Sequence, residues 1–300
     1  MYKLIVINMN LIQVFQKFKT QDDCIVHLEK AKWDGCAVCP YCQSTKTTSL
    51  KKELRHHCNS CNTHFSVTVN TIFHNTKLPL QKWFLAISLI LNAKKGISSR
   101  HLSRDIEVNK DTAWSMQMRI RKAMMDDGKW MTGIVEMDET YIGGKGRKNK
   151  DGTPLKRGRG TNKTAVVGIA ERGGKVVATK HERVRFQDLK KTAEKNIDFD
   201  NATLMTDDFK GYIPFKKIVK HETVNHSAKE YVNGNKHTNT IEGFWSLLKR
   251  GITGQYHWLS DKWLNQYIQE FCFKYNNREN ANAFDLLVGN MVKCAEDYGR

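Results

Sequence analysis

The segment IVEMDETYIGG, residues 134–144, joins an apolar run typical of a β-strand to an acidic side chain, Asp138. The segment ATLMTDDFKGY, residues 202–212, repeats this pattern with Asp207. Each carboxylate therefore follows a run of residues that a sheet would bury. We expect both carboxylates to lie at the same end of one sheet.

The chain between and after these segments alternates between strand and helix patterns. A hairpin, a short helix and two amphipathic helices are predicted, in this order, at residues 164–184, 187–197, 239–252 and 262–276. Three antiparallel strands, a helix, a further strand and then helices form the order of the ribonuclease H-like fold. We therefore expect a mixed sheet in an α/β or α+β catalytic domain.

A third carboxylate, Glu242, lies on the helical segment HTNTIEGFWSLLKRG, residues 237–251. Carboxylate oxygens are ligands for Mg²⁺ or Mn²⁺, and a pair of such ions stabilises both the attacking and the leaving oxygen at phosphorus. Lys249 follows about two helical turns later on the same face and could hold a phosphate. Asn239, one turn earlier, is an alternative third ligand.

Each of these carboxylates, taken alone, also fits a solvated surface group or a helix cap. The metal site is predicted from the three together, in this order along the chain. Two neighbouring acids, Glu139 and Asp208, rank lower as ligands because adjacent strand residues point to opposite faces of a sheet.

The N-terminal part contains two CxxC pairs with 15 residues between them. Their thiols belong to Cys39, Cys42, Cys58 and Cys61. Two such turns close a tetrahedron around Zn²⁺, so the segment predicts a zinc ribbon with a structural ion. Unrelated cysteine pairs are the alternative.

Other cysteines and histidines leave a ligand exchange open at this zinc site. The candidates for an exchange are Cys36, His56 and His57. We expect the remaining three thiols to be small buried apolar groups, at Cys24, Cys272 and Cys294. The clustering of cysteines before residue 62 favours metal binding in a reducing compartment.

Residues 80–126 predict a helix-turn-helix, in which Ser98 or Ser99 caps a short helix and the turn EVN leads into a longer one. The second helix would enter the major groove. Its candidate DNA contacts are Lys110, Asp111, Thr112 and Ser115, with Arg119 and Arg121 nearer the backbone. Plain three-helix packing is the alternative. Three apolar residues of this helix are expected in the core, namely Trp114, Met118 and Met125.

Composition indicates a polyanionic partner, because the formal net charge is +18 and the isoelectric point is about 9.5. Residues 143–163 contain eight Lys or Arg. This stretch either binds DNA backbone or forms a surface loop without a specific role. The candidate contacts here and on the last catalytic helix are Lys145, Arg147, Lys156, Arg157, Arg159 and Arg250. His226 and His237 fit structural histidines better than DNA contacts.

No apolar run reaches the roughly 18 residues that span a bilayer, and no signal peptide is apparent, so we expect a cytoplasmic, nucleoid-associated protein without membrane contact. Translation could begin at Met1 or Met9. We expect three parts along the chain. They are a zinc ribbon within residues 1–75, a helix-turn-helix region at 76–130 and a catalytic domain at 131–300.

Together these motifs are similar to those of the DDE transposases of bacterial insertion sequences, specifically the ISXO-like group with an N-terminal zinc ribbon. The similar segments, within residues 20–285, are CPYC, CNSC, FSVTVNTIF, GISSRHLSRDI, MDETYIGGK, TDDFKGY and HTNTIEGFWSLLKRGI. The resemblance implies Mg²⁺-dependent cleavage at transposon ends and transfer of the freed 3′-OH into target DNA. It also implies a homo-oligomer on double-stranded DNA.

The resemblance assigns metal binding to Asp138, Asp207 and Glu242, with Lys249 as the accompanying lysine. Members of the group vary at the third ligand, so the choice between Glu242 and Asn239 stays open. Two other functions compete with a transposase. A DNA-binding regulator would leave the three carboxylates without a purpose, and a nuclease on the same fold would cut DNA but never join it.

Overall fold

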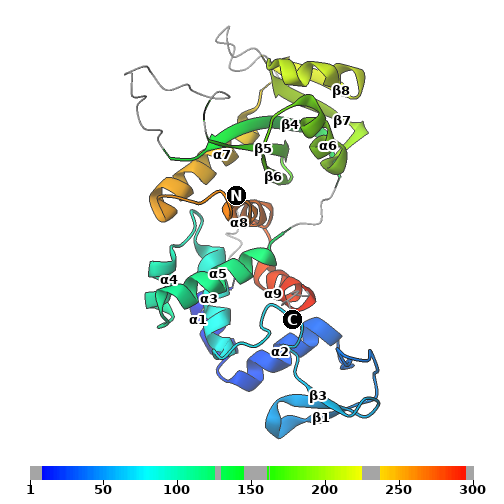
Figure 1. Cartoon of the computed structure of the whole chain (residues 1–300), viewed down its shortest axis with the longest axis vertical. Helices are drawn as coiled ribbons and strands as arrows, with labels where there is room; N and C mark the ends of the chain where they lie inside the picture. The colour runs from blue at the N-terminus through cyan, green and yellow to red at the C-terminus, as the bar shows by residue number, and fades with distance from the viewer. Residues whose placement is uncertain (1–8, 126–129, 145–160, 162, 225–236, 295–300) are drawn as a thin grey trace, which may run out of the picture. The chain divides into compact units, whose positions relative to one another are not determined.

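The computed structural model describes residues 9–125, 130–144, 161, 163–224 and 237–294 (Figure 1). These residues form two compact units. One unit takes its residues from 1–124 and 277–300, and the other from 125–276. Within the described ranges, no helix is long and apolar enough to cross a membrane.

The unit within residues 125–276 is built on one five-stranded sheet (Figure 1). Its strands are β4 (Met131–Ile142), β5 (Thr164–Glu171), β6 (Val176–His181), β7 (Ile197–Asp207) and β8 (Lys220–Val224). The spatial order is β6-β5-β4-β7-β8, with β4, β5 and β6 antiparallel and β7 and β8 parallel to β4. This is the mixed ribonuclease H-like sheet that the sequence predicts.

Helices cover both faces of this sheet. They are α6 (Phe186–Asn196), the 3-10 helix η3 (Lys210–Lys217), α7 (Asn239–Gly251), the π-helical turn η5 (Ile252–Tyr256) and α8 (Leu264–Asn276). Each face of the sheet has its own hydrophobic core. Val166 of β5 packs with α7 and α8 in one core, and the next residue, Val167, packs with α6 and η3 in the other. This alternation is the period of two that a strand buried on both faces requires.

The other unit combines a small antiparallel sheet with helices. Its strands, in the order β1-β2-β3, are β1 (Thr47–Leu50), β2 (Arg55–Cys58) and β3 (Thr63–Phe65), with the short 3-10 helix η1 (Lys51–Glu53) between the first two. Its helices are α1 (Leu11–Lys17), α2 (Gln21–Trp33), α3 (Leu80–Asn92), α4 (Ser99–Asp105), α5 (Lys110–Lys122) and α9 (Ala283–Lys293). The predicted zinc ribbon and helix-turn-helix therefore share one compact unit.

The helix-turn-helix forms from α4 and α5. Ser98 caps α4 by accepting a hydrogen bond from the His101 N–H, and Asn109 caps α5 by accepting one from the Thr112 N–H. Glu107 takes a left-handed backbone conformation (φ 51°) in the turn. The preceding helix, α3, ends at Asn92, and Gly96 takes a left-handed backbone conformation (φ 86°) before α4 begins.

The C-terminal helix α9 departs from the predicted domain division, which assigned residues 131–300 to the catalytic domain. Phe284 of α9 packs against Phe18 and Phe84, and the Met291 carbonyl accepts a hydrogen bond from the Ile72 N–H at 3.0 Å. The helix therefore belongs to the N-terminal unit. An amphipathic pattern predicts a buried face but does not identify the surface that buries it.

Candidate functional site

A hollow of about 460 Å³ opens where β4, β7 and α7 meet. The residues that line it are Asp138, Glu139, Thr140, Asp207, Thr238, Glu242, Trp245, Ser246 and Lys249. The structure thus brings the three predicted carboxylates and the predicted lysine into one site. Four of the nine side chains are acidic and one is basic, so the hollow favours cations.

Strand register explains why Asp138 and Asp207 meet. The last paired residues of the parallel strands β4 and β7 are Glu136 and Met205. Both aspartates lie two residues beyond that pair, at the same end of the sheet. Every second side chain of a strand points to the same face of the sheet. Asp138 therefore points to the same face as Glu136, and Asp207 to the same face as Met205.

The approach of α7 to the sheet depends on a glycine. Gly168 pairs with Asp138 in the β4–β5 ladder, and a Cβ at Gly168 would lie 2.5 Å from the Trp245 ring. The missing side chain lets Trp245 lie against the sheet, where its Nε1 donates a hydrogen bond to Asp138 Oδ2 at 3.0 Å. Trp245 thereby orients one proposed ligand and shields it from water.

The surroundings of Asp138 disfavour its ionised form, and a nearby cation would stabilise it. Burial raises the pKa of its carboxyl to about 7, and the charges of Glu139 and Asp207 add to the effect. Three carboxylates near one another repel unless a positive charge lies between them. Oxygen donors of this kind fit Mg²⁺ or Mn²⁺, so the residues present match the metal that the sequence predicts.

Glu242 and Lys249 reach the hollow from the exposed face of α7. The Thr238 hydroxyl donates a hydrogen bond to Glu242 Oε1 at 2.8 Å, which orients that carboxylate. Asn239 is exposed at the start of α7 and is not among the residues that line the hollow. The position of the two side chains favours Glu242 as the third ligand.

Glu139 lies where its neighbouring position on β4 predicts, on the opposite face of the sheet from Asp138. It borders the hollow, but its Oε2 accepts a hydrogen bond from the Tyr212 hydroxyl at 2.7 Å. Tyr212 belongs to the core that α6 and η3 cover, whereas Asp138 accepts its hydrogen bond from Trp245 of α7 on the other face. Asp208, which was also ranked lower, does not line the hollow.

Sequence reasoning missed Thr238 and Trp245, which hold Glu242 and Asp138 in place. Thr238 lies directly before a predicted helix, so the sequence predicts a helix cap there. The sequence pattern does not predict that its hydroxyl orients the Glu242 carboxylate instead. Trp245 follows Glu242 by three residues and so lies one turn away. Its apolar character indicates only a core position.

The zinc site is well defined. The four sulfurs of Cys39, Cys42, Cys58 and Cys61 all lie within 4.8 Å of one another, with Sγ–Sγ distances of 3.7 Å for Cys39–Cys61 and 3.5 Å for Cys42–Cys58. Tetrahedral Zn²⁺ with bonds of about 2.3 Å separates its sulfur ligands by about 3.8 Å. The cluster therefore fits the structural zinc ion.

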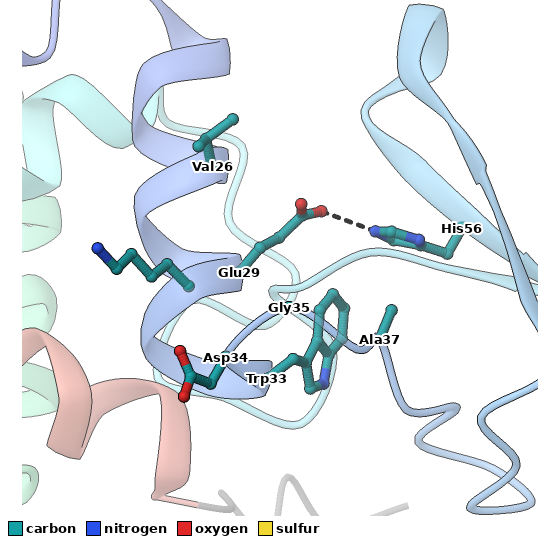
Figure 2. Close-up of a pocket in the computed structure, with 8 residues that line it drawn as sticks. Val26, Glu29, Trp33, Asp34, Gly35, Ala37 and His56 are labelled. Carbon is teal, nitrogen blue, oxygen red and sulfur yellow. Dashed lines mark hydrogen bonds and ion pairs between the residues drawn. The ribbon is translucent and has the colours of Figure 1, made fainter.

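The alternative ligands lie outside this cluster. His56 pairs with Glu29 at 2.7 Å across the pocket shown in Figure 2, and its ring stacks on Phe65. Cys36 is exposed and does not belong to the four-sulfur group. The other three thiols largely match their prediction, because Cys24 and Cys272 are buried and Cys294 is partly buried.

The helix-turn-helix presents only part of its predicted DNA surface. Lys110 and Ser115 are exposed and Thr112 is partly exposed. Arg121 is buried (1% exposed), with Nη1 donating to Met118 Sδ, and Arg119 donates to the His74 carbonyl while lying over the Trp83 ring. Arg121 is thus a packing residue, contrary to the prediction, whereas Arg119 is partly exposed and its DNA contact stays a prediction.

The burial of Arg121 follows from helical periodicity. The buried residues of α5 include Ala113, Gln117 and Ile120, and Arg121 lies on the same stripe. One apolar residue was also misplaced, because Met125 is 51% exposed whereas Met118 is buried and Trp114 is partly buried.

Several predicted DNA contacts lie outside the described residues, namely Lys145, Arg147, Lys156, Arg157 and Arg159. His226 also lies outside them. Arg250 is exposed on α7 and bonds to Ser246. His237 is partly buried, with its Nδ1 3.5 Å from Glu136 Oε1, which agrees with the predicted structural role.

Comparison with known proteins agrees with this architecture. Residues 19–64 match the profile of a transposase zinc-ribbon domain, and residues 131–276 match that of an ISXO2-like transposase domain. Both profiles describe transposases, the class of enzymes that cut and join DNA, and they cover the ribbon and the mixed sheet in the order found here. The chain therefore combines a transposase zinc-ribbon domain with an ISXO2-like transposase domain.

A curated relative is the "Uncharacterized protein in transposable element ISH50" of Halobacterium salinarum. It is 28% identical over 264 residues, which cover 81% of this chain and 87% of that protein. Among solved structures, the pre-cleavage Mos1 transpososome is 13% identical, with coverage of 71% and 78% and a TM-score of 0.30. The Mos1 strand transfer complex is 11% identical, with coverage of 67% and 78% and a TM-score of 0.21. At such TM-scores, the fold assignment rests on the sheet order and the matched profiles.

Proposed function

We propose that this transposase cuts and joins DNA at the hollow between β4, β7 and α7, with Asp138, Asp207 and Glu242 as ligands of two divalent metal ions. The observation that carries the proposal is the meeting of these three carboxylates at one sheet end, although they are far apart along the chain. Such ions, when bound, activate the attacking oxygen and neutralise charge at the leaving oxygen.

The protein's own groups prepare this chemistry. Trp245 fixes Asp138 Oδ2 and covers it, while the Thr238 hydroxyl fixes Glu242 Oε1. Lys249, exposed at the rim of the hollow, provides a positive charge for a phosphate of the DNA strand. The carboxylates repel an unaccompanied phosphate, so this lysine also guides the backbone.

DNA recognition is assigned to the N-terminal unit. Lys110, Thr112 and Ser115 lie in the first two turns of α5, the part of a recognition helix that contacts base edges. The zinc ribbon would add further backbone contacts. Because two transposon ends must be joined to one target, we propose that the protein acts as a homo-oligomer on double-stranded DNA.

The test compares wild type with Asp207→Asn on labelled DNA that carries the ends of the element, in Mg²⁺. The matched control is Asp200→Asn, an exposed position toward the other end of the same strand. We expect nicked and joined products from wild type and the control, and none from Asp207→Asn, with equal DNA binding by all three.

Three results would contradict the proposal. Metal-dependent cutting that survives in Asp207→Asn would remove the carboxylate from the reaction. Cutting without any joined product would identify a nuclease, and specific binding without cutting in wild type would indicate a regulator.

A further inference from the structure

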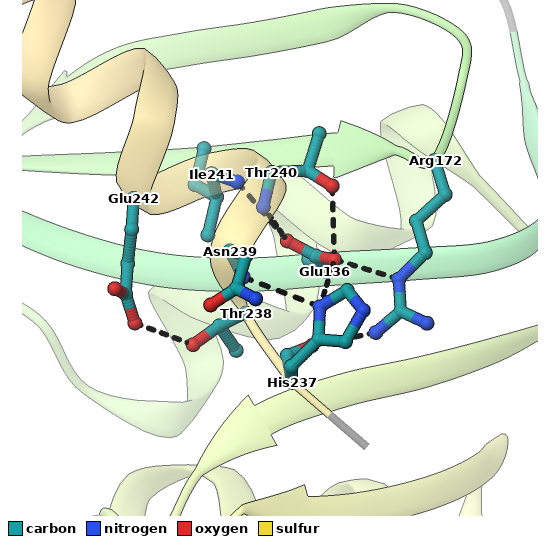
Figure 3. A network of polar contacts seen from close by, with 8 residues as sticks. All are labelled: Glu136, Arg172, His237, Thr238, Asn239, Thr240, Ile241 and Glu242. Carbon is teal, nitrogen blue, oxygen red and sulfur yellow. Dashed lines mark hydrogen bonds and ion pairs between the residues drawn. The ribbon is translucent and has the colours of Figure 1, made fainter. Parts of the chain in front are cut away.

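Glu136 is a fully buried carboxylate (0% exposed) that does not line the hollow. It lies on β4 two residues before Asp138, so both side chains belong to the same row of the strand. Figure 3 shows Glu136 among the residues that begin α7. A buried charge is costly unless it is fully hydrogen-bonded, so its contacts require an explanation.

Every oxygen of Glu136 is engaged. Oε2 accepts hydrogen bonds from the N–H groups of Thr240 (2.8 Å) and Ile241 (3.0 Å). Oε1 accepts from the Thr240 hydroxyl at 3.0 Å and from Arg172 Nε at 2.7 Å. The first N–H groups of a helix lack partners within the helix and carry partial positive charge, so a carboxylate satisfies them well.

This cap comes from the sheet and not from the helix itself. Thr238 occupies the N-cap position, but its side chain makes no capping hydrogen bond to α7's backbone. Its hydroxyl instead donates to Glu242 Oε1 at 2.8 Å. The residue that would ordinarily cap α7 is thereby released to orient the proposed ligand.

Arg172, the residue after the end of β5, makes the remaining contacts, and we call Glu136 and Arg172 together the clamp. Its Nη2 donates to the His237 carbonyl at 2.6 Å, and its backbone N–H donates to the Ile134 carbonyl of β4 at 3.0 Å. Residues 237 and 240–241 are therefore held on both sides of Thr238 and tied to the strand that carries Asp138 (Figure 3).

We propose that Glu136 and Arg172 are positioning residues that lock the first turn of α7 to β4 and thereby hold the Glu242 carboxylate opposite Asp138. The inference rests on the proposed role of Glu242 as a metal ligand. Packing of α7 already comes from apolar residues such as Phe244 and Leu248, which are buried in the adjoining core. A buried ion pair adds little net stability compared with apolar groups, whereas it can specify one arrangement.

The test uses Glu136→Gln in the full-length protein. The glutamine keeps the shape but loses the charge, and it places an amide donor where only an acceptor fits. The matched control is Glu270→Gln, which removes another fully buried carboxylate, paired with Lys274 on α8, without touching the first turn of α7.

Two readouts separate positioning from general stability. We expect hydrogen exchange at the Thr240 and Ile241 amides to accelerate at least tenfold in Glu136→Gln and not in Glu270→Gln. We also expect the Mg²⁺ concentration for half-maximal DNA cleavage to rise at least tenfold in Glu136→Gln, with DNA affinity within twofold of wild type. Unchanged exchange, or an unchanged Mg²⁺ requirement, would overturn the proposal.

A second variant keeps the proposal testable if Glu136→Gln does not fold. Thr238→Val removes the link to Glu242 and leaves the clamp itself in place, so it should raise the Mg²⁺ requirement without changing exchange at Thr240 and Ile241. An unchanged Mg²⁺ requirement in Thr238→Val would contradict the proposed path. A wild-type protein that never cuts DNA would instead refute the proposed function, while the exchange experiment would still show whether the clamp exists.

Discussion

The zinc site and the carboxylate hollow, our proposed second metal site, are built in two different ways in one chain. The four cysteines lie within residues 39–61, and their sulfurs already lie within 4.8 Å of one another. The carboxylates come from two strands and a helix, spread over residues 138–242, and they surround an open hollow. A local, closed site suits a structural ion, whereas an open site drawn from distant elements leaves room for a substrate.

The two sites also differ in what prepares them. At the ribbon, the backbone N–H of Cys61 lowers the pKa of the Cys58 thiol to about 6, whereas burial and the neighbouring thiols raise the pKa of Cys42 to about 12, so the thiols lose their protons at different pH values. At the hollow, burial raises the pKa of the Asp138 carboxyl to about 7. The ribbon is thus prepared by short-range contacts, while the hollow carries an electrostatic penalty that a bound cation would relieve.

The largest expected effect is on catalysis. We expect Asp138→Asn to reduce cleavage and joining at least about 10³-fold, equivalent to about 4 kcal/mol of transition-state stabilisation. Zinc content and DNA affinity should stay unchanged, because the N-terminal unit does not depend on this side chain. The measurement is single-turnover cleavage together with metal analysis. Loss of zinc in this variant would contradict the separation of the two sites.

The second effect concerns folding of the ribbon. Structural zinc contributes about 10–16 kcal/mol in zinc-finger peptides, so Cys58→Ser should unfold the ribbon and lower DNA affinity at least about tenfold. Cys36→Ser is the matched control, since that thiol is exposed and outside the cluster. Hydrogen exchange should show faster exchange in β1–β3 only for Cys58→Ser. Equal behaviour of the two variants would show that the cluster holds no zinc.

The third effect tests how tertiary packing builds the hollow. Gly168→Ala places a methyl group against the Trp245 ring, so α7 must shift and the hydrogen bond to Asp138 weakens. We expect a loss of about 1–3 kcal/mol in the free energy of unfolding and a clear fall in cleavage. Gly289→Ala is the control, because its Cβ would meet open space. Unchanged cleavage in Gly168→Ala would mean that Trp245 does not orient Asp138.

The smallest expected effect is the pH dependence of metal binding. Protons compete with metal ions for Asp138 below its pKa of about 7, so half-maximal cleavage should need about tenfold more Mg²⁺ at pH 6 than at pH 8. The measurement is a Mg²⁺ titration of cleavage at both pH values. An equal Mg²⁺ requirement would show that no proton leaves the site on metal binding.

The raised pKa of Asp138 also makes the free energy of unfolding of the metal-free protein depend on pH, but this free energy falls as the pH rises, whereas metal binding strengthens. Because the folded-state pKa is raised, the folded protein binds this proton more tightly than the unfolded chain does. The free energy of unfolding should therefore fall by about 3 kcal/mol as the pH rises from about 4 to about 7, and Asp138→Asn should abolish that part of the fall. Chemical denaturation in the presence of a chelator measures both.

The sequence by itself determined the features that depend on neighbouring residues. The two CxxC turns predict their zinc cluster, the Ser98 cap and the turn EVN predict α4 and α5, and the apolar runs before Asp138 and Asp207 predict the two strands that carry them. Each follows from short-range geometry. The order of the elements was enough for the ribonuclease H-like sheet.

Tertiary structure alone decided which surfaces meet. It placed α9 in the N-terminal unit, buried Arg121 and packed Trp245 against Asp138. It also placed Glu136 at the start of α7, more than a hundred residues away along the chain. Periodicity specifies that a residue has a buried face, but the partner is chosen by packing and hydrogen bonding between distant segments, which no local pattern encodes.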